Sequence, residues 1–139
     1  MSNKADLPIQ ETFHSFQGEG VHLGRSAFFI RTYGCPVKCP WCDSAGTWHK
    51  DYLPSEKTWM TTEKIVEQIK EANPEIVVIT GGEPTIHDLT DLTTAIKELD
   101  VTIHLETCGA FVFKGKPHFD WITVSPKREA LPLAEHICT

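Results

Sequence analysis

Three cysteines lie within one short stretch of the sequence. Cys35, Cys39 and Cys42 are spaced Cys-x3-Cys-x2-Cys, and a loop this short can direct all three sulfurs at one centre. Three thiolates can hold three irons of a 4Fe–4S cluster and leave the fourth iron open. An open metal position can bind a further molecule, as it does in catalytic metal sites generally. The spacing therefore predicts a cluster with a vacant coordination position.

A structural zinc site is the main alternative for this loop. Such a site usually takes four ligands, often supplied by Cys-x2-Cys arms. Only Cys39 and Cys42 form such an arm, and His49 is the nearest candidate for a fourth ligand. The loop alone therefore favours an iron–sulfur cluster and leaves zinc open.

Apolar and β-branched runs around the cysteine loop predict four strands. The first leads directly into the loop, and the second is a continuous apolar run of the kind found in parallel strands covered on both faces. Residues 1–10 are expected to form an N-terminal arm that could begin an edge strand. The four predicted strands are 26–33, 75–80, 101–106 and 121–125.

Two helices are predicted, one before and one after the second predicted strand. Thr61 can cap the first, which should end at Asn73, and Asp88 can cap the second. Strands that alternate with helices imply crossover connections and a parallel sheet. We therefore predict one α/β domain over residues 1–139, arranged as a partial, incomplete parallel β/α barrel.

Unusual motifs follow each predicted strand. In parallel sheets, ligands bind beyond the carboxyl ends of the strands, so motifs at these four ends should converge on one site. Each motif alone could be an ordinary turn. In chain order they are the cysteine loop, Gly81-Gly82-Glu83-Pro84, Glu106-Thr107-Cys108-Gly109 and Ser125-Pro126-Lys127.

The chemistry of these motifs suits a small zwitterion. Gly81 and Gly82 would expose backbone groups with no side chain in the way, and Glu83 could accept a hydrogen bond from an ammonium. The alternative for this motif is a tight turn before a helix. Ser125 and Lys127 could bind a hydroxyl and a carboxylate, although most lysines are simply solvated.

Two further features lie earlier in the chain. Arg31 stands inside a predicted buried strand, where a charge needs a partner. It could form a salt bridge with a neighbouring carboxylate, or its guanidinium could clamp an anionic ligand. The glycines of Gln17-Gly18-Glu19-Gly20 indicate a tight turn, which could approach a ligand or lie plainly on the surface.

Composition narrows the class of protein. The 139 residues are 40% hydrophobic and 23% charged, which is ordinary for one globular domain. Residues 1–6 lack the apolar core of a signal peptide and no run is long enough to span a membrane. We expect a cytoplasmic location, where thiols stay reduced. The net charge of −6 argues against direct nucleic-acid binding.

The cysteine loop resembles the signature of the radical S-adenosylmethionine (SAM) enzymes. Their pattern is Cys-x3-Cys-x2-Cys with an aromatic residue before the last cysteine, and Trp41 stands at that position. The resemblance implies that SAM binds the open iron and is cleaved to methionine and a 5′-deoxyadenosyl radical. It names a superfamily but not a reaction.

Motifs between Glu11 and Lys127 resemble one family within it, the 7-carboxy-7-deazaguanine synthases of queuosine and deazapurine biosynthesis. The resemblance implies a lyase that converts 6-carboxy-5,6,7,8-tetrahydropterin to 7-carboxy-7-deazaguanine with loss of ammonia. The motifs are Phe16-Gln17-Gly18-Glu19-Gly20, Phe29-Ile30-Arg31, Cys42-Asp43, Thr80-Gly81-Gly82-Glu83-Pro84, Glu106-Thr107 and Val124-Ser125-Pro126-Lys127.

The family resemblance also implies site residues and partners. It implies Mg²⁺ beside the substrate, a one-electron donor such as a flavodoxin-like protein, and a homodimer. Catalytic roles fall to Cys35, Cys39, Cys42, Glu19 and Arg31. Pterin contacts fall to Phe16, Gln17, Gly18, Glu19, Arg31 and Thr80. SAM contacts fall to Trp41, Cys42, Asp43, Gly82, Glu83, Ser125, Pro126 and Lys127, and the Mg²⁺ ligand is Ser44.

Two departures from the family pattern stand out. Ser44 replaces a threonine, which keeps the hydroxyl but loses the methyl that stiffens the side chain. The family also continues well past Ser-Pro-Lys, whereas this sequence stops at Thr139. The sequence is either a fragment of a longer gene product or a shortened form. In both cases we expect an open partial barrel with an apolar edge to cover, and poor activity of the 139-residue chain alone.

Two other functions remain open at this point. One is a glycyl-radical-enzyme activase of the same superfamily, against which Arg31, the Gln-Gly-Glu-Gly turn and Ser125-Pro126-Lys127 argue. The other is a non-catalytic zinc- or cluster-binding module, which would not need Gly81-Gly82-Glu83-Pro84.

Overall fold

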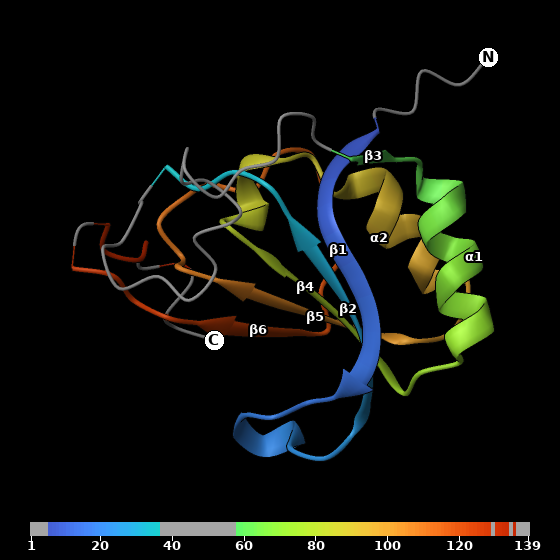
Figure 1. The fold of residues 1–139 in the computed structure, drawn as a ribbon. Helices are drawn as coiled ribbons and strands as arrows, with labels where there is room; N and C mark the ends of the chain where they lie inside the picture. Colours follow the sequence, from blue (N-terminus) through green and yellow to red (C-terminus); the bar gives the residue numbers. More distant parts are fainter. Residues whose placement is uncertain (1–5, 37–57, 129, 134, 136–139) are drawn as a thin grey trace.

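The computed structural model describes residues 6–36, 58–128, 130–133 and 135 (Figure 1). Cys35 lies within these ranges. The predictions for Cys39, Trp41, Cys42, Asp43 and Ser44 lie outside the described residues.

One mixed sheet forms the centre of the described chain, with helices on a single face (Figure 1). Strands β2, β4, β5 and β6 run parallel. Strand β1 pairs antiparallel with β2, and β3 pairs antiparallel with β1. The strand order is β3-β1-β2-β4-β5-β6. The strands are β1 Leu7–Phe16, β2 Ser26–Thr32, β3 Trp59–Met60, β4 Ile76–Gly81, β5 Thr102–Thr107 and β6 Trp121–Val124.

The four parallel strands confirm the predicted α/β arrangement, and the sheet is open, as a partial barrel requires. The expectation for the N-terminus was wrong in extent. Residues 7–16 form a ten-residue strand between β2 and β3, not a short arm. Its polar residues obscure the strand in the sequence. Leu7 and Ile9 pack into the core, and the ring of Phe13 stacks on Phe29 at 4.9 Å between centroids.

Both predicted helices are confirmed. The hydroxyl of Thr61 accepts a hydrogen bond from the Lys64 N–H at 3.1 Å, and the first helix ends at Asn73, whose left-handed backbone (φ 47°) turns the chain. Asp88 accepts from the Thr90 N–H at 3.0 Å at the start of the second. The helices are α1 Thr62–Ala72 and α2 Thr90–Lys97, with short 3₁₀ turns η1 Gly20–His22 and η3 Pro84–Ile86.

The hydrophobic core lies between the sheet and the two helices. Alternation along the strands sends every second side chain to this face. The opposite face carries a small apolar cluster around Val78 and, by the same alternation, the side chains of Arg31, Thr80, His104 and Glu106. The buried core residues are Leu7, Ile9, Phe28, Ile30, Met60, Ile65, Ile69, Val77, Ile79, Leu89, Leu92, Ile96, Ile103 and Leu105.

Within the described ranges, no helix is both long and apolar enough to cross a membrane.

Replacing Ile79 with alanine tests the core. Ile79 is 0% exposed in the middle of β4, and its truncation should lower the free energy of unfolding by about 3 kcal/mol through lost burial and a residual cavity. Val112, which is 70% exposed, offers a control whose alanine variant should stay within about 0.5 kcal/mol. Urea denaturation followed by circular dichroism measures both; a loss below about 1 kcal/mol at Ile79 would contradict this packing.

Candidate active site at the carboxyl ends of the parallel strands

The predicted convergence of motifs is confirmed for the described residues. Hydrogen bonds join the ends of β2, β4, β5 and β6 to one another. The Glu83 N–H donates to the Gly34 carbonyl at 2.7 Å, and the Ser125 N–H donates to the Thr107 carbonyl at 2.8 Å. The start of the cysteine loop and the motifs after the three later strands therefore share one edge of the sheet. We call this edge the rim.

Gly81 and Gly82 allow the end of β4 to approach the end of β2. A Cβ on Gly82 would lie 2.0 Å from the Gly34 carbonyl oxygen, and one on Gly81 would lie 2.4 Å from Thr32 Oγ1. Neither position has space for a side chain. The glycines are thus required by contact with the segment that begins the cysteine loop, in addition to any ligand they expose.

The segment that leads into Cys35 is held on a second side by η3. Gly34 has φ +96°, a left-handed conformation that glycine adopts at little cost. The ring Nε2 of His87 lies 2.8 Å from the Tyr33 carbonyl oxygen. Cys35 follows directly and is half-buried. The first cysteine of the predicted cluster therefore leaves the sheet from a backbone supported by both β4 and η3.

Glu83 is buried and fully engaged at its Oε2 atom. Only 2% of it is exposed. Oε2 accepts from the Thr85 N–H at 3.1 Å, the Thr85 hydroxyl at 2.5 Å and the Thr107 hydroxyl at 2.6 Å, and Oε1 accepts from the Cys108 N–H at 2.8 Å. The described residues thus show Glu83 joining β4, η3 and β5. Direct acceptance from a cofactor ammonium stays a prediction.

Cys108 is a neutral thiol beside this carboxylate. Burial raises its pKa to about 12, and the nearby negative charges of Glu83 and Cys35 act in the same direction. A thiol that stays protonated at neutral pH is a poor metal ligand and nucleophile. Cys108 therefore behaves as the small buried residue that its isolated position in the sequence predicts.

Arg31 has the carboxylate partner that a buried-strand arginine needs. Its Nε lies 3.0 Å from Glu11 Oε1 on β1, and its Nη1 donates to the Gly81 carbonyl at 3.4 Å. Thr80 is its register partner on β4, on the same face of the sheet. The salt-bridge interpretation is therefore confirmed, while the clamp on an anionic ligand stays a prediction.

The Gln17-Gly18-Glu19 turn lies at the other end of the sheet, with the loop between β1 and β2 (Figure 1). Phe16 pairs with Ser26, five residues before Arg31 on β2, which is about 17 Å along a strand. Phe16 is also 68% exposed. The described residues therefore do not bring Phe16–Glu19 beside Arg31 and Thr80, although all six were predicted to contact one substrate.

The remaining predicted positions end β6. Ser125 is fixed to the rim by its bond to Thr107, and Lys127 forms an isolated bridge with Ala130. Sequence reasoning missed Thr85 and His87, and it named Thr107 only as part of a motif, without its hydrogen bond to Glu83. A short hydroxyl-bearing side chain directly after or at the end of a strand is the only sequence signal that could have found the two threonines.

Comparison with known proteins places the chain in a superfamily. Residues 29–125 match the profile of the radical SAM superfamily, which is most of the chain. The chain therefore belongs to the radical SAM superfamily. Members of this superfamily use a 4Fe–4S cluster and SAM, and the predicted fold is consistent with that membership.

Individual relatives carry a more specific name than the superfamily. The chain is 50% identical over 127 residues to the 7-carboxy-7-deazaguanine synthase of Synechocystis, with 91% of this chain and 58% of the relative covered. It is 37% identical over 140 residues to that of Escherichia coli, covering 86% and 60%. The crystal structure of QueE from Escherichia coli superposes with a TM-score of 0.77 at 36% identity, covering 95% and 66%. The chain spans about three-fifths of the length of these curated relatives.

Replacing Gly82 with alanine tests the contact between β4 and the start of the cysteine loop. The added Cβ would displace the Gly34 backbone, so the affinity for the cluster should fall about 10- to 100-fold, as it does when groups that support metal ligands are removed. Iron and acid-labile sulfide are measured after anaerobic reconstitution. Gly18→Ala is the matched control, because a Cβ there meets nothing within 4 Å. Full iron content in the Gly82 variant would refute the argument.

Proposed function

We propose that the chain carries the cofactor-binding part of a 7-carboxy-7-deazaguanine synthase. The reaction would convert 6-carboxy-5,6,7,8-tetrahydropterin to 7-carboxy-7-deazaguanine with loss of ammonia, in queuosine or deazapurine biosynthesis. The observation that carries the proposal is the joining of Gly34, Gly82–Glu83, Thr107 and Ser125 at one rim, directly beside Cys35. The identity to synthases of known name supports the choice of reaction.

The residues at the rim suit the implied cofactors. The donor set is three thiols, of which Cys35 emerges at the supported end of β2, and Cys39 and Cys42 would supply the others. When bound, the cluster supplies one electron that cleaves SAM. Gly82, Ser125, Pro126 and Lys127 would line the SAM site from the ends of β4 and β6, with Trp41 and Asp43 from the loop.

Arg31 and Thr80 would receive the substrate. They are register partners on β2 and β4, on the face of the sheet opposite the core residues Ile30 and Ile79. A guanidinium matches a carboxylate in shape and charge, so Arg31 would bind the pterin carboxylate and Thr80 would contact the ring. Phe16, Gln17, Gly18 and Glu19 stay proposed pterin contacts, although Phe16 lies about 17 Å along the strand from Arg31. Ser44 would bind Mg²⁺.

Partners and location are part of the same proposal. A flavodoxin-like protein would supply the electron and the chain would act in a homodimer in the cytoplasm, where thiols remain available as ligands. Because longer relatives extend beyond the matched region, the 139-residue chain should turn over the pterin more slowly than a full-length relative.

Anaerobic reconstitution with iron and sulfide tests the proposed class. The loaded chain should be brown and should form 5′-deoxyadenosine from SAM on reduction. With the pterin present, SAM should be regenerated, so methionine should not accumulate with turnover. Methionine accumulating in step with turnover would instead indicate an activase. A colourless protein that holds one zinc would refute the enzyme altogether.

Two substitutions distinguish the proposed binding of the pterin carboxylate by Arg31 from its salt bridge with Glu11. Arg31→Met should raise the pterin Kd about 10- to 100-fold, because a charged hydrogen-bonding partner is lost. Glu11→Gln breaks the same ion pair but leaves the guanidinium, so the pterin Kd should stay unchanged or fall. Anaerobic titration calorimetry measures both variants. Equal effects of the two substitutions would show that Arg31 is only a structural ion-pair partner.

A further inference from the structure

An aromatic cluster docks the loop between β1 and β2 onto the start of the sheet. We call it the imidazole cluster, and it consists of His22 from η1, His104 from β5 and Trp121 from β6. The ring centroids of His22 and His104 are 4.5 Å apart, and those of His22 and Trp121 are 4.8 Å apart, both in perpendicular arrangements. One loop residue therefore packs against side chains of two neighbouring strands.

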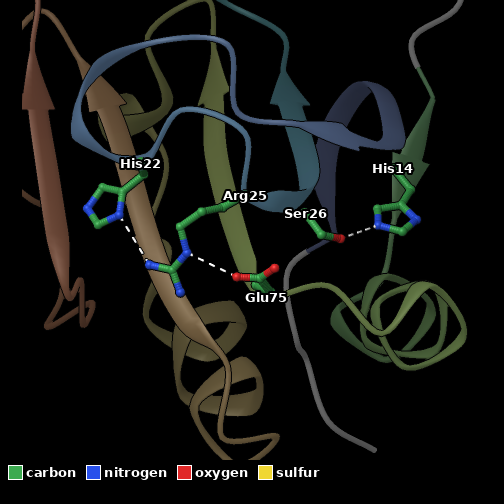
Figure 2. A network of polar contacts seen from close by, with 5 residues as sticks. All are labelled: His14, His22, Arg25, Ser26 and Glu75. Carbon is green, nitrogen blue, oxygen red and sulfur yellow. Dashed lines mark hydrogen bonds and ion pairs between the residues drawn. The ribbon is translucent and has the colours of Figure 1, made fainter.

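The cluster buries two imidazole nitrogens that have no hydrogen-bond partner among the described residues. They are the Nε2 atoms of His22 and His104, and His104 is only 3% exposed. Arg25 Nη1 lies 3.2 Å from His22 Nδ1 (Figure 2). Because a guanidinium only donates, His22 Nδ1 accepts and the neutral ring carries its proton on Nε2. That N–H has no hydrogen-bond acceptor among the described residues, and the His22 ring packs against the rings of His104 and Trp121.

Arg25 also joins the loop between β1 and β2 to the rest of the chain. It pairs with Glu75, which precedes β4, at 3.1 Å (Figure 2). The Gln17 N–H donates to the Arg25 carbonyl at 2.9 Å, and the Gly24 N–H donates to the Gln17 carbonyl at 2.7 Å. The position of the Gln17-Gly18-Glu19 turn is thus tied to the docking of His22.

We propose that His104 is a positioning residue that, through His22, seats the 17–25 loop against the sheet only while the His104 imidazole is neutral. Protonation of His104 releases the loop and with it the Gln17-Gly18-Glu19 turn. The statement that this turn contacts substrate rests on the proposed function. The docking itself does not.

The charges around His104 set the direction of this effect. His22 and Arg25 face it from the loop, and Asp120 faces it from the segment before β6. Burial lowers the pKa of His104 to about 4, with the electrostatic influence of His22 and Arg25 acting in the same direction and that of Asp120 opposing them. Burial alone would raise the pKa of Asp120, but hydrogen bonds from the Ile103 N–H and His118 hold that pKa below its usual range. Asp120 therefore remains an anion.

Protonation of His104 favours the undocked loop. An exposed histidine has a pKa of about 6.5, whereas the docked ring has a pKa of about 4, so the proton binds more tightly when the loop is undocked. Docking should be unaffected above about pH 6.5 and should weaken as the pH falls toward 4. Between pH 7.5 and pH 5 the docking equilibrium should weaken on the order of 30-fold.

Hydrogen exchange of the reconstituted chain measures loop docking without substrate. After correction for intrinsic rates, exchange in residues 16–25 should accelerate on the order of 30-fold between pH 7.5 and pH 5. Residues 76–79 of β4 serve as the internal reference for global stability. In His104→Phe, which keeps a ring but cannot titrate, most of this acceleration should be lost. His118→Gln, which removes a histidine that bonds Asp120 but lies outside the cluster, should keep most of the acceleration.

The alternative is that the cluster is ordinary packing. In that case the loop would exchange at the same corrected rate at both pH values, or His104→Phe would keep the full pH dependence, and either result overturns the proposal. If His104→Phe does not fold, NMR of the unsubstituted chain decides. The ring protons of His104 and the amides of Gln17 and Gly24 should titrate with one midpoint, and separate midpoints would overturn the proposal.

Pterin affinity distinguishes this inference from the proposed function. If both hold, the pterin Kd should rise between pH 7.5 and pH 5 in the unsubstituted chain but much less in His104→Phe. Loop release without any pterin binding would refute the proposed function and leave the positioning role of His104 intact. Release that leaves the pterin Kd unchanged would refute the link between loop and substrate.

Discussion

The close contact between the ends of β2 and β4 is the constraint on which the rim depends. Gly82 lies against the Gly34 carbonyl with no space for a side chain, and the next residue donates a hydrogen bond to the same oxygen. The ends of β2 and β4 therefore lie side by side. The segment that leads from β2 into the cysteine loop and the segment that leads from β4 into η3 are thus fixed in position relative to each other. Displacing one strand end would displace the other.

A buried carboxylate extends this constraint to a third strand. Burying an unpaired charge would be costly, but Glu83 is surrounded by hydroxyl and amide donors from η3 and β5. None of these donors carries a positive charge, so the burial of Glu83 depends on all of them being present. Such a network is rigid because the loss of any member leaves a buried acceptor unsatisfied. The network thereby fixes the positions of Thr107 and Cys108 relative to Gly82.

The two ends of the sheet have different physical characters. The rim is held by backbone contacts and by hydrogen bonds to the buried carboxylate of Glu83. The opposite end is held by two imidazoles, an exposed Arg25–Glu75 pair and aromatic packing. Exposed ion pairs contribute little to stability, so the imidazole cluster is the main contact holding that loop. The contacts that hold the rim and those that hold the loop between β1 and β2 are thus separated along the strands.

Patterning alone determined the four parallel strands, both helices and the convergence of three strand-end motifs with Cys35. These depend on apolar runs, capping residues and the rule that parallel strands present their carboxyl ends together. The strand at residues 7–16 was predicted only as an arm that could begin an edge strand, because its polar residues break the apolar pattern and pairing with β2 stabilises it instead. Only tertiary structure could show that Glu83 meets Thr107 and Cys108, or that His22 meets His104. Those partners are brought together by the arrangement of the strands across more than twenty residues of sequence, and no local pattern encodes that distance.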